Sequence, residues 1–406
     1  MPTSIERRAG RLTPTLGLGA TPILGVLLAF LGSLLMLGGC GGDVPKADDA
    51  GGGVPQSREA AGSEADNSAA DQSGNNRKAS TNERSVAYRT EVMGTWGTVT
   101  IVTADSSASG SVATAALDTW HHVDRLLSNW KETSELSRVN SEAGSDTVEV
   151  DRELAFVLGR ALEVADASGG TFDVTVEPLV RLWGFLGGTP HVPEQSEIAA
   201  TLARTGWKNV WLDPQTRRVK FVLPGLKVDL GGIAKGYGVD LAYGVLREAG
   251  VSGMVDLSGN IRTLGTPAGR DAWYVGVRDP RDRAPYFARL KLHEAAMATS
   301  GQYEQFAAKD GKKFGHILDP RTGWPAEGLL SVTVLAPSAT DADAWATALF
   351  VMGPAMAREM AKMRPDLAVI LVEDGHGAKD VVWVEDEVGE RFELVDGVDF
   401  VEVREF

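Results

Sequence analysis

Cysteine is almost absent from this chain, and positive charge is in deficit. Cys40 is the only cysteine among 406 residues, which excludes an internal disulfide. The 55 Asp and Glu residues outnumber the 40 Lys and Arg residues, and the net charge is −15 at pH 7. Without a basic surface to attract phosphates, we expect no binding to nucleic acid. An anionic ligand would need a local lysine, a helix N-terminus or a metal ion.

Several catalytic signatures are also missing. The sequence has no G-x-S-x-G elbow and no serine, cysteine or histidine triad that spacing supports. The six histidines show no metal-ligand spacing, so a zinc site is not expected. Any activity must therefore depend on other groups.

The first 39 residues have the composition of an export signal. A basic leader, Arg7 to Arg11, precedes an apolar run, Ile23 to Leu37, and small residues then lead to Cys40. This order is typical of a signal peptide. The end of the run resembles the lipobox of bacterial lipoproteins, which implies a lipidated Cys40. We expect an exported protein, lipid-anchored to the bacterial membrane and facing the periplasm; the alternative is a membrane-spanning anchor with an incidental cysteine.

Residues 40–84 are rich in Gly, Ala, Ser, Asp and Asn and have almost no large apolar side chains. Such a segment buries too little surface to offset its ordering entropy, which favours a flexible tether. Residues 85–406 form the predicted folded module, where helical and strand patterns mix without regular βαβ alternation. This mixture favours an α+β fold. The predicted helices cover residues 111–127, 152–167, 342–352 and 354–363, and the predicted strands lie within 86–103, 210–222, 226–230, 253–257, 273–277, 331–335, 368–372 and 381–384.

The stretch from Asp229 to Tyr237, DLGGIAKGY, is the most informative in the chain. An apolar run precedes its glycines, and a helical pattern follows Gly236. A glycine turn that leads into a helix presents bare N–H groups to an anion, and Lys235 adds a full charge. The stretch matches neither G-x-x-x-x-G-K-[ST] nor G-x-G-x-x-G. Both a phosphate cradle and a tight turn with glycines for packing remain open.

Three further clusters carry chemistry. Asp343 and Thr347 share one helix face, and their oxygens suit Mg²⁺, although helix capping by Thr340, Asp341 or Asp343 is the alternative. His316 precedes an Asp-Pro turn and could move a proton near neutral pH, or it could simply end a strand. Aromatic residues, including Trp130 and Phe172, could stack on a flat heterocycle or belong to the core.

Taken together, these stretches resemble the ApbE-like FAD:protein FMN transferases over roughly residues 89–352. The matching segments occur in the family's order. They are Met93-Gly94-Thr95, Ser128-Asn129-Trp130, Ser134 to Asn140, Gly170 to Thr175, Asp229 to Tyr237, Gly259-Asn260, Ala298 to Tyr303, His316 to Gly323 and Asp343 to Thr347. One departure is Trp130, which stands where the family usually has tyrosine.

The resemblance implies an ApbE-like flavin transferase fold and the transfer of FMN from FAD onto a threonine hydroxyl of an acceptor protein, with Mg²⁺ as cofactor and release of AMP. The acceptor would be a subunit of a membrane redox complex. Mg²⁺ ligands would be Asp343, Thr347 and the main-chain carbonyl of Gly232. The residues lining the FAD site would be Met93, Trp130, Thr171, Phe172, Asp173, Asp229, Lys235 and Ile317.

His316 is the candidate general base, and Asp229 is the second candidate. Two other functions remain open. With water as the acceptor, the same site would be an FAD pyrophosphatase that yields FMN and AMP. Without any reaction, the chain would be a non-enzymatic FAD-binding lipoprotein.

Overall fold

The computed structural model describes residues 83–302 and 305–406. The predicted signal peptide, Cys40 and the tether up to residue 82 lie outside the described residues, as does Tyr303. Arg84, the last residue of the predicted tether, opens the first strand. Within the described ranges, no helix combines the length and the apolar character needed to cross a membrane.

A nine-stranded sheet forms the centre of the described part. Its strand order is β1-β2-β6-β7-β10-β13-β14-β15-β17, and all neighbours are antiparallel except the β15–β17 pair. Such a sheet with packed helices confirms the predicted α+β class. The strands are β1 (Arg84–Val92), β2 (Thr95–Thr103), β6 (Gly253–Leu257), β7 (Asn260–Leu264), β10 (Ala296–Gly301), β13 (Leu329–Ala336), β14 (Ala368–Glu373), β15 (Asp380–Val384) and β17 (Val401–Glu405).

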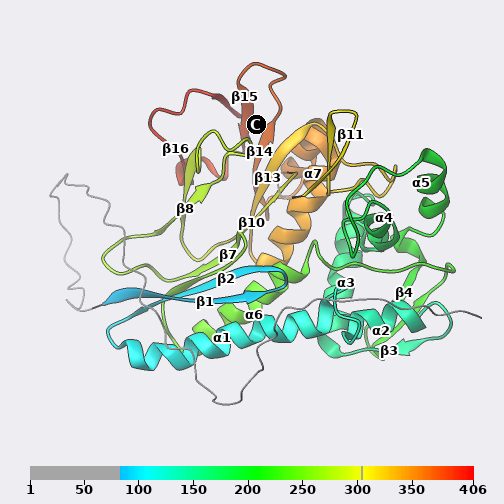
Figure 1. The fold of residues 1–406 in the computed structure, drawn as a ribbon. Coiled ribbons are helices and arrows are strands. Elements are labelled where there is room, and N and C mark those ends of the chain that lie inside the picture. The colour runs from blue at the N-terminus through cyan, green and yellow to red at the C-terminus, as the bar shows by residue number, and fades with distance from the viewer. Residues whose placement is uncertain (1–82, 303–304) are drawn as a thin grey trace, which may run out of the picture. The chain divides into compact units, whose positions relative to one another are not determined.

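Both faces of this sheet are covered, as Figure 1 shows. The helices α1 (Ser106–Leu127), α6 (Ala234–Glu248) and α7 (Ala339–Lys362) pack on one face. A three-stranded sheet packs on the other, with β9 (Ala288–Leu292) between β16 (Phe392–Leu394) and β8 (Trp273–Val277). On β13, Val334 therefore joins the helix-side core and Leu335 joins the opposite one. Burial on both faces explains the nearly continuous apolar sequence of this strand.

Most of the remaining elements lie between α2 and α6 in the chain, and α3 among them packs against α7. The α3 helix buries Leu154, Leu158 and Ala161 along one stripe, as helical periodicity requires. After it, Gly169 and Gly170 adopt φ values of +65° and +81°, a backbone conformation that glycine tolerates best. The elements outside the central sheet and its two covering layers are α2 (Glu135–Glu142), α3 (Arg152–Ala167), α4 (Glu177–Leu182), α5 (Gln195–Leu202), β3 (Val148–Glu149), β4 (Val210–Asp213), β5 (Arg218–Phe221), β11 (Phe306–Lys309), β12 (Lys312–Gly315) and the 3₁₀ turns Val174–Val176, Trp207–Asn209 and Gly389–Arg391.

Most predicted elements are confirmed, and the bounds of α3, β6 and β8 coincide with the prediction. The two helices predicted over residues 342–363 form one element, α7, which changes direction at Gly353 with φ +74°. The sequence did not predict the strands β3, β7, β9, β10, β11, β12, β16 and β17.

The predicted strand 226–230 is wrong. The segment has no partner strand, because side chains take its central hydrogen bonds instead. Asn140 Oδ1 accepts from the N–H of Val228 at 2.8 Å, and its Nδ2 donates back to the Val228 carbonyl at 2.9 Å. Asn129 Nδ2 donates to the same carbonyl at 3.1 Å. The two amide side chains thus make the hydrogen bonds to Val228 that a neighbouring strand would otherwise make.

Candidate functional site

A cavity of about 320 Å³ lies where the 229–237 stretch, the start of α7 and the end of β10 meet. Its volume falls in the range of small-molecule sites. The structure brings together every site residue predicted from the sequence except one. Those that line the cavity are Trp130, Thr171, Phe172, Asp173, Asp229, Gly232, Lys235, His316, Ile317, Asp343 and Thr347.

Met93 is the exception. It occupies the β1–β2 turn with φ +52° and packs against two apolar clusters, but it does not line the cavity. Conversely, the cavity contains polar residues to which the sequence assigned no role: Ser258, Asn260, Thr299, Ser300 and Gln305. Part of the signal was present: Asn260 opens β7, and Thr299 and Ser300 place polar side chains near the end of β10.

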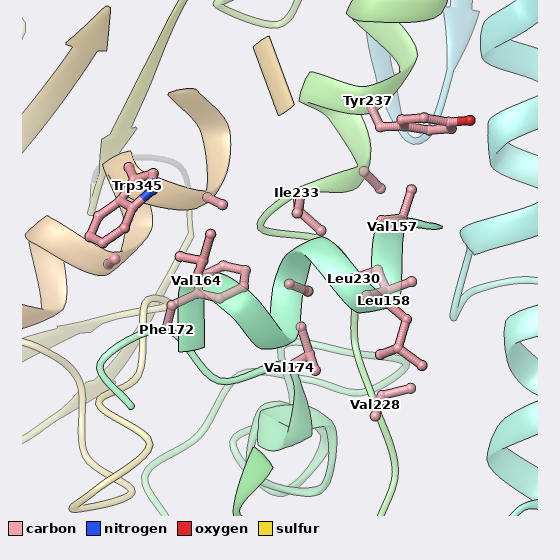
Figure 2. Packing of buried hydrophobic residues seen from close by; sticks show 14 of the residues in the cluster. Val157, Leu158, Val164, Phe172, Val174, Val228, Leu230, Ile233, Tyr237 and Trp345 are labelled. Atoms are coloured by element: carbon pink, nitrogen blue, oxygen red, sulfur yellow. The ribbon is translucent and has the colours of Figure 1, made fainter. Parts of the chain in front are cut away.

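The backbone before α6 is held rigidly under the cavity. Asp229 donates its N–H to the Val174 carbonyl at 2.7 Å. Leu230 and Ile233 are fully buried, and Figure 2 shows them in the same apolar cluster as Leu158 and Phe172. Because both sides of the stretch are anchored, its glycines present a fixed main chain to the cavity.

The start of α6 depends on a residue from another helix. Its N-cap residue, Ile233, offers no side-chain acceptor. The N–H of Gly236 instead donates to Asp343 Oδ2 at 2.9 Å. A methyl group at Gly236 would lie only 2.1 Å from the Ala339 carbonyl oxygen, so glycine is needed for this approach. Asp343 therefore does cap a helix, but that helix is α6; the N-cap of α7 is Ser338.

Oxygen atoms gather at the same corner of the cavity. The hydroxyls of Thr347 and Ser300 are 3.2 Å apart. Gly232 lies beside them, because a methyl group there would be 3.5 Å from Thr347 Oγ1. A buried carboxylate from Asp343, a hydroxyl and main-chain carbonyls fit a hard cation such as Mg²⁺. The described residues include no group of three His, Cys, Asp or Glu side chains suited to a metal. This finding does not bear on the corner described here, because its only carboxylate is that of Asp343 and its other donors are hydroxyl and carbonyl oxygens.

Two cavity carboxylates have raised pKa values. Burial raises the pKa of Asp229, and hydrogen bonds from Gly231 and Asn129, together with the charge of Lys235, offset this only in part. Burial likewise raises the pKa of Asp173. Asp173 accepts from Thr175 through Oδ1 and from the N–H of Trp207 through Oδ2, so it stabilises the cavity wall. Asp229 also lines the cavity, and its Oδ1 accepts the N–H of Gly231 at 2.7 Å.

The aromatic residues divide between core and cavity. Trp183 is fully buried and stacks on Phe185 with ring centroids 6.3 Å apart, so it belongs to the core. Phe185 also lines the cavity and meets the ring of His316 edge to face at 6.3 Å. Trp130 is 67% exposed at the cavity. Flat surfaces and a histidine thus occupy the same pocket as the oxygen donors.

The fold and the cavity define an α+β protein with a small-molecule pocket that carries oxygen donors and a lysine. The model of the ApbE family matches residues 93–371. The FAD:protein FMN transferase of Klebsiella pneumoniae (strain 342) is 32% identical over 296 residues, which cover 71% of this chain and 85% of that protein. The chain belongs to the ApbE family.

Solved structures agree with this assignment. The ApbE protein from Thermotoga maritima has a TM-score of 0.66 at 36% identity, over 72% of this chain and 95% of its own. The flavin transferase ApbE from Vibrio cholerae has a TM-score of 0.66 at 31% identity, with the same coverage. The fold is that of the flavin transferases.

Proposed function

We propose that this chain is an FAD:protein FMN transferase that moves FMN from FAD onto a threonine hydroxyl of an acceptor protein. The observation that carries the proposal is the meeting of Lys235, His316 and Asp343 in one cavity. The name and the reaction class are those of relatives at 32% identity over most of the chain. The family membership makes the chain an enzyme, and FAD is its substrate.

In the reaction, the acceptor hydroxyl loses its proton and its oxygen forms a bond to the phosphorus of FMN. The bond from that phosphorus to the AMP half breaks, and AMP leaves with the bridging oxygen. The ammonium of Lys235, which lines the cavity, stabilises the negative charge of the diphosphate. His316 takes the proton, and Asp229 is the second candidate for this role.

A bound Mg²⁺ would be held by Asp343, Thr347 and the Gly232 carbonyl, where it would neutralise charge on the diphosphate. The aromatic rings of Phe172 and Trp130 suit the flavin, since flat faces stack. These side chains fix the phosphorus in line with the incoming oxygen, which accounts for much of the rate in phosphoryl transfer.

The predicted leader and Cys40 support an exported, lipid-anchored enzyme that faces the periplasm. Its acceptor would be an exported domain of a membrane redox complex with a threonine motif. Mass spectrometry of the membrane-bound protein should find a chain that begins at an acylated Cys40, and Cys40→Ala should prevent both the acylation and the removal of the leader. A membrane-bound wild-type chain that keeps residues 1–39 and carries no lipid would count against the lipid anchor.

The proposed reaction is tested with FAD, Mg²⁺ and an acceptor domain, followed by mass spectrometry of the acceptor. We expect an acceptor with one added FMN, equimolar AMP, and no adduct when the acceptor threonine is replaced by valine. Free FMN with unmodified acceptor would identify a pyrophosphatase instead. Intact FAD would identify a binding protein.

A further inference from the structure

The two helices that meet at the cavity cap each other. Besides the bond from Gly236 to Asp343, a second set of bonds runs in the opposite direction. Asp240, in the second turn of α6, accepts the N–H of Ala339 at 2.9 Å and the N–H of Thr340 at 2.9 Å. These residues are the first two of α7.

Asp240 provides most of the N-terminal capping of α7. An α-helix leaves its first four N–H groups without partners inside the helix. In α7, Ser338 Oγ accepts only one of them, the N–H of Asp341, at 3.1 Å. Asp240 accepts two N–H groups and also the Thr340 hydroxyl, at 2.6 Å. Its negative charge at the positive end of the helix adds to this stabilisation.

Asp240 is itself fixed by Arg262 of β7. One guanidinium nitrogen donates to Asp240 Oδ1 at 2.5 Å, and another donates to the Pro337 carbonyl at 3.0 Å. The guanidinium also stacks over the ring of Tyr243 at 4.0 Å. The Asp240 side chain is only 16% exposed. It therefore ties the sheet, α6 and the first turn of α7 together.

The consequence concerns the cation site. Gly232 precedes α6, whereas Asp343 and Thr347 lie one and two turns into α7. The separation between these oxygen donors therefore depends on how the starts of the two helices are aligned. We propose that Asp240, which does not line the cavity, is a positioning residue that holds the Mg²⁺-binding oxygens in register. This inference rests on the proposed function.

The test measures Mg²⁺ binding directly, by calorimetry on the full-length protein without FAD. We expect Asp240→Ala to raise the dissociation constant for Mg²⁺ about tenfold or more, as is typical when a residue behind a metal ligand is lost. In the transfer assay, the Mg²⁺ concentration for half-maximal rate should rise by the same factor. The rate at saturating Mg²⁺ should return close to that of the wild type. Asp240→Asn keeps a carbonyl oxygen for one N–H group, so its shift should be smaller.

A matched control separates positioning from general stability. Asp279, which does not line the cavity, also accepts several N–H groups and an arginine. Asp279→Ala should lower the melting temperature but leave Mg²⁺ affinity unchanged. Equal Mg²⁺ affinity in Asp240→Ala and wild type, with FMN transfer intact, would overturn the inference alone. If Asp240→Ala does not fold, Asp240→Asn decides in the same way. A wild-type protein that neither binds Mg²⁺ nor transfers FMN would overturn the proposed function and the inference with it.

Discussion

Aspartates in two regions of the molecule have opposite pKa shifts. In the cavity, burial raises the pKa of Asp229 and Asp173. In the loop after β8 and at the start of β15, burial alone would also raise the pKa of Asp279 and Asp380. There, hydrogen bonds from arginines and N–H groups outweigh burial and lower both pKa values.

The difference lies in the partners. Arg283 is 2.8 Å from Asp279 and 2.7 Å from Asp380, and Arg281 is 3.0 Å from Asp380. In the cavity, Asp229 and Asp173 accept hydrogen bonds from N–H and hydroxyl groups rather than from guanidinium groups. The guanidinium partners of Asp279 and Asp380 outweigh the effect of burial on the pKa. The partners of Asp229 offset burial only in part, so its pKa stays raised.

The largest effect should come from removing the cavity carboxylate that we propose as a Mg²⁺ ligand. Asp343→Ala removes both the proposed Mg²⁺ ligand and the acceptor of the Gly236 N–H, so we expect Mg²⁺-dependent transfer to be abolished. The assay is FMN adduct formation across a Mg²⁺ titration. The control is Asp341→Ala on the same helix, whose carboxylate pairs with Arg160 at 2.6 Å. Retained transfer with unchanged Mg²⁺ dependence in Asp343→Ala would show that Mg²⁺ does not bind at this corner of the cavity.

The next largest effect on the transfer rate should come from removing the candidate general base, which takes the proton of the acceptor hydroxyl. His316→Ala should lower the transfer rate by roughly 10²–10⁴ if His316 is the general base. Single-turnover kinetics at saturating FAD isolate the chemical step. His293, an exposed histidine outside the cavity, provides the control, and its replacement by alanine should leave the rate unchanged. A near-wild-type rate for His316→Ala would give His316 a structural role and favour Asp229 as the base.

Replacing Asp279 and replacing Asp229 by asparagine should change the free energy of unfolding in opposite directions, because the pKa of Asp279 is lowered and that of Asp229 is raised. At neutral pH, Asp279→Asn should destabilise the protein by about 3 kcal/mol, because it breaks a buried ion pair. Since the folded pKa of Asp279 is depressed, its contribution is present above the ordinary value of 3.8 and is lost as pH falls through the lower folded value. The gap between variant and wild type should close in that acidic range.

Asp229→Asn should stabilise the protein at neutral pH rather than destabilise it. The folded pKa of Asp229 lies above 3.8, so its ionised form costs stability at neutral pH. The variant should be slightly more stable than the wild type at pH 7, and the advantage should shrink as pH falls through the raised pKa. Urea unfolding at several pH values measures both variants. Stability changes of the same sign in Asp279→Asn and Asp229→Asn would contradict the opposite pKa shifts of these two carboxylates.

What could be predicted from the sequence was local. The periodicity of α3 and the glycines after it fix that helix to the residue. The cavity side chains could be named from their chemistry, because oxygen donors, a lysine and aromatic rings stand in short segments. The fate of residues 226–230 could not be read from those residues. Their hydrogen-bond partner Asn140 lies 88 positions away and acts through a side chain, so an extended apolar run had the pattern of a strand without being one.

The mutual capping of α6 and α7 was beyond reach for the same reason. The bond from Gly236 to Asp343 spans 107 positions, and the bond from Ala339 to Asp240 spans 99. Within α7, Asp343 and Thr347 could be placed on one face, but the partner of Asp343 depends on where another helix begins. Tertiary packing decides which of several possible roles a polar side chain takes.

The smallest effect extends the comparison to tryptophan. Trp183 is fully buried in the core, whereas Trp130 is 67% exposed at the cavity. Removing a stacking platform weakens binding of a flat base by about tenfold. Trp130→Ala should therefore raise the dissociation constant for FAD by about that factor without lowering the melting temperature, and Trp130→Tyr should restore most of the affinity. Fluorescence titration with FAD in EDTA measures this binding apart from the metal. Equal affinity in Trp130→Ala and wild type would place the flavin elsewhere in the cavity, against Phe172 and Phe185.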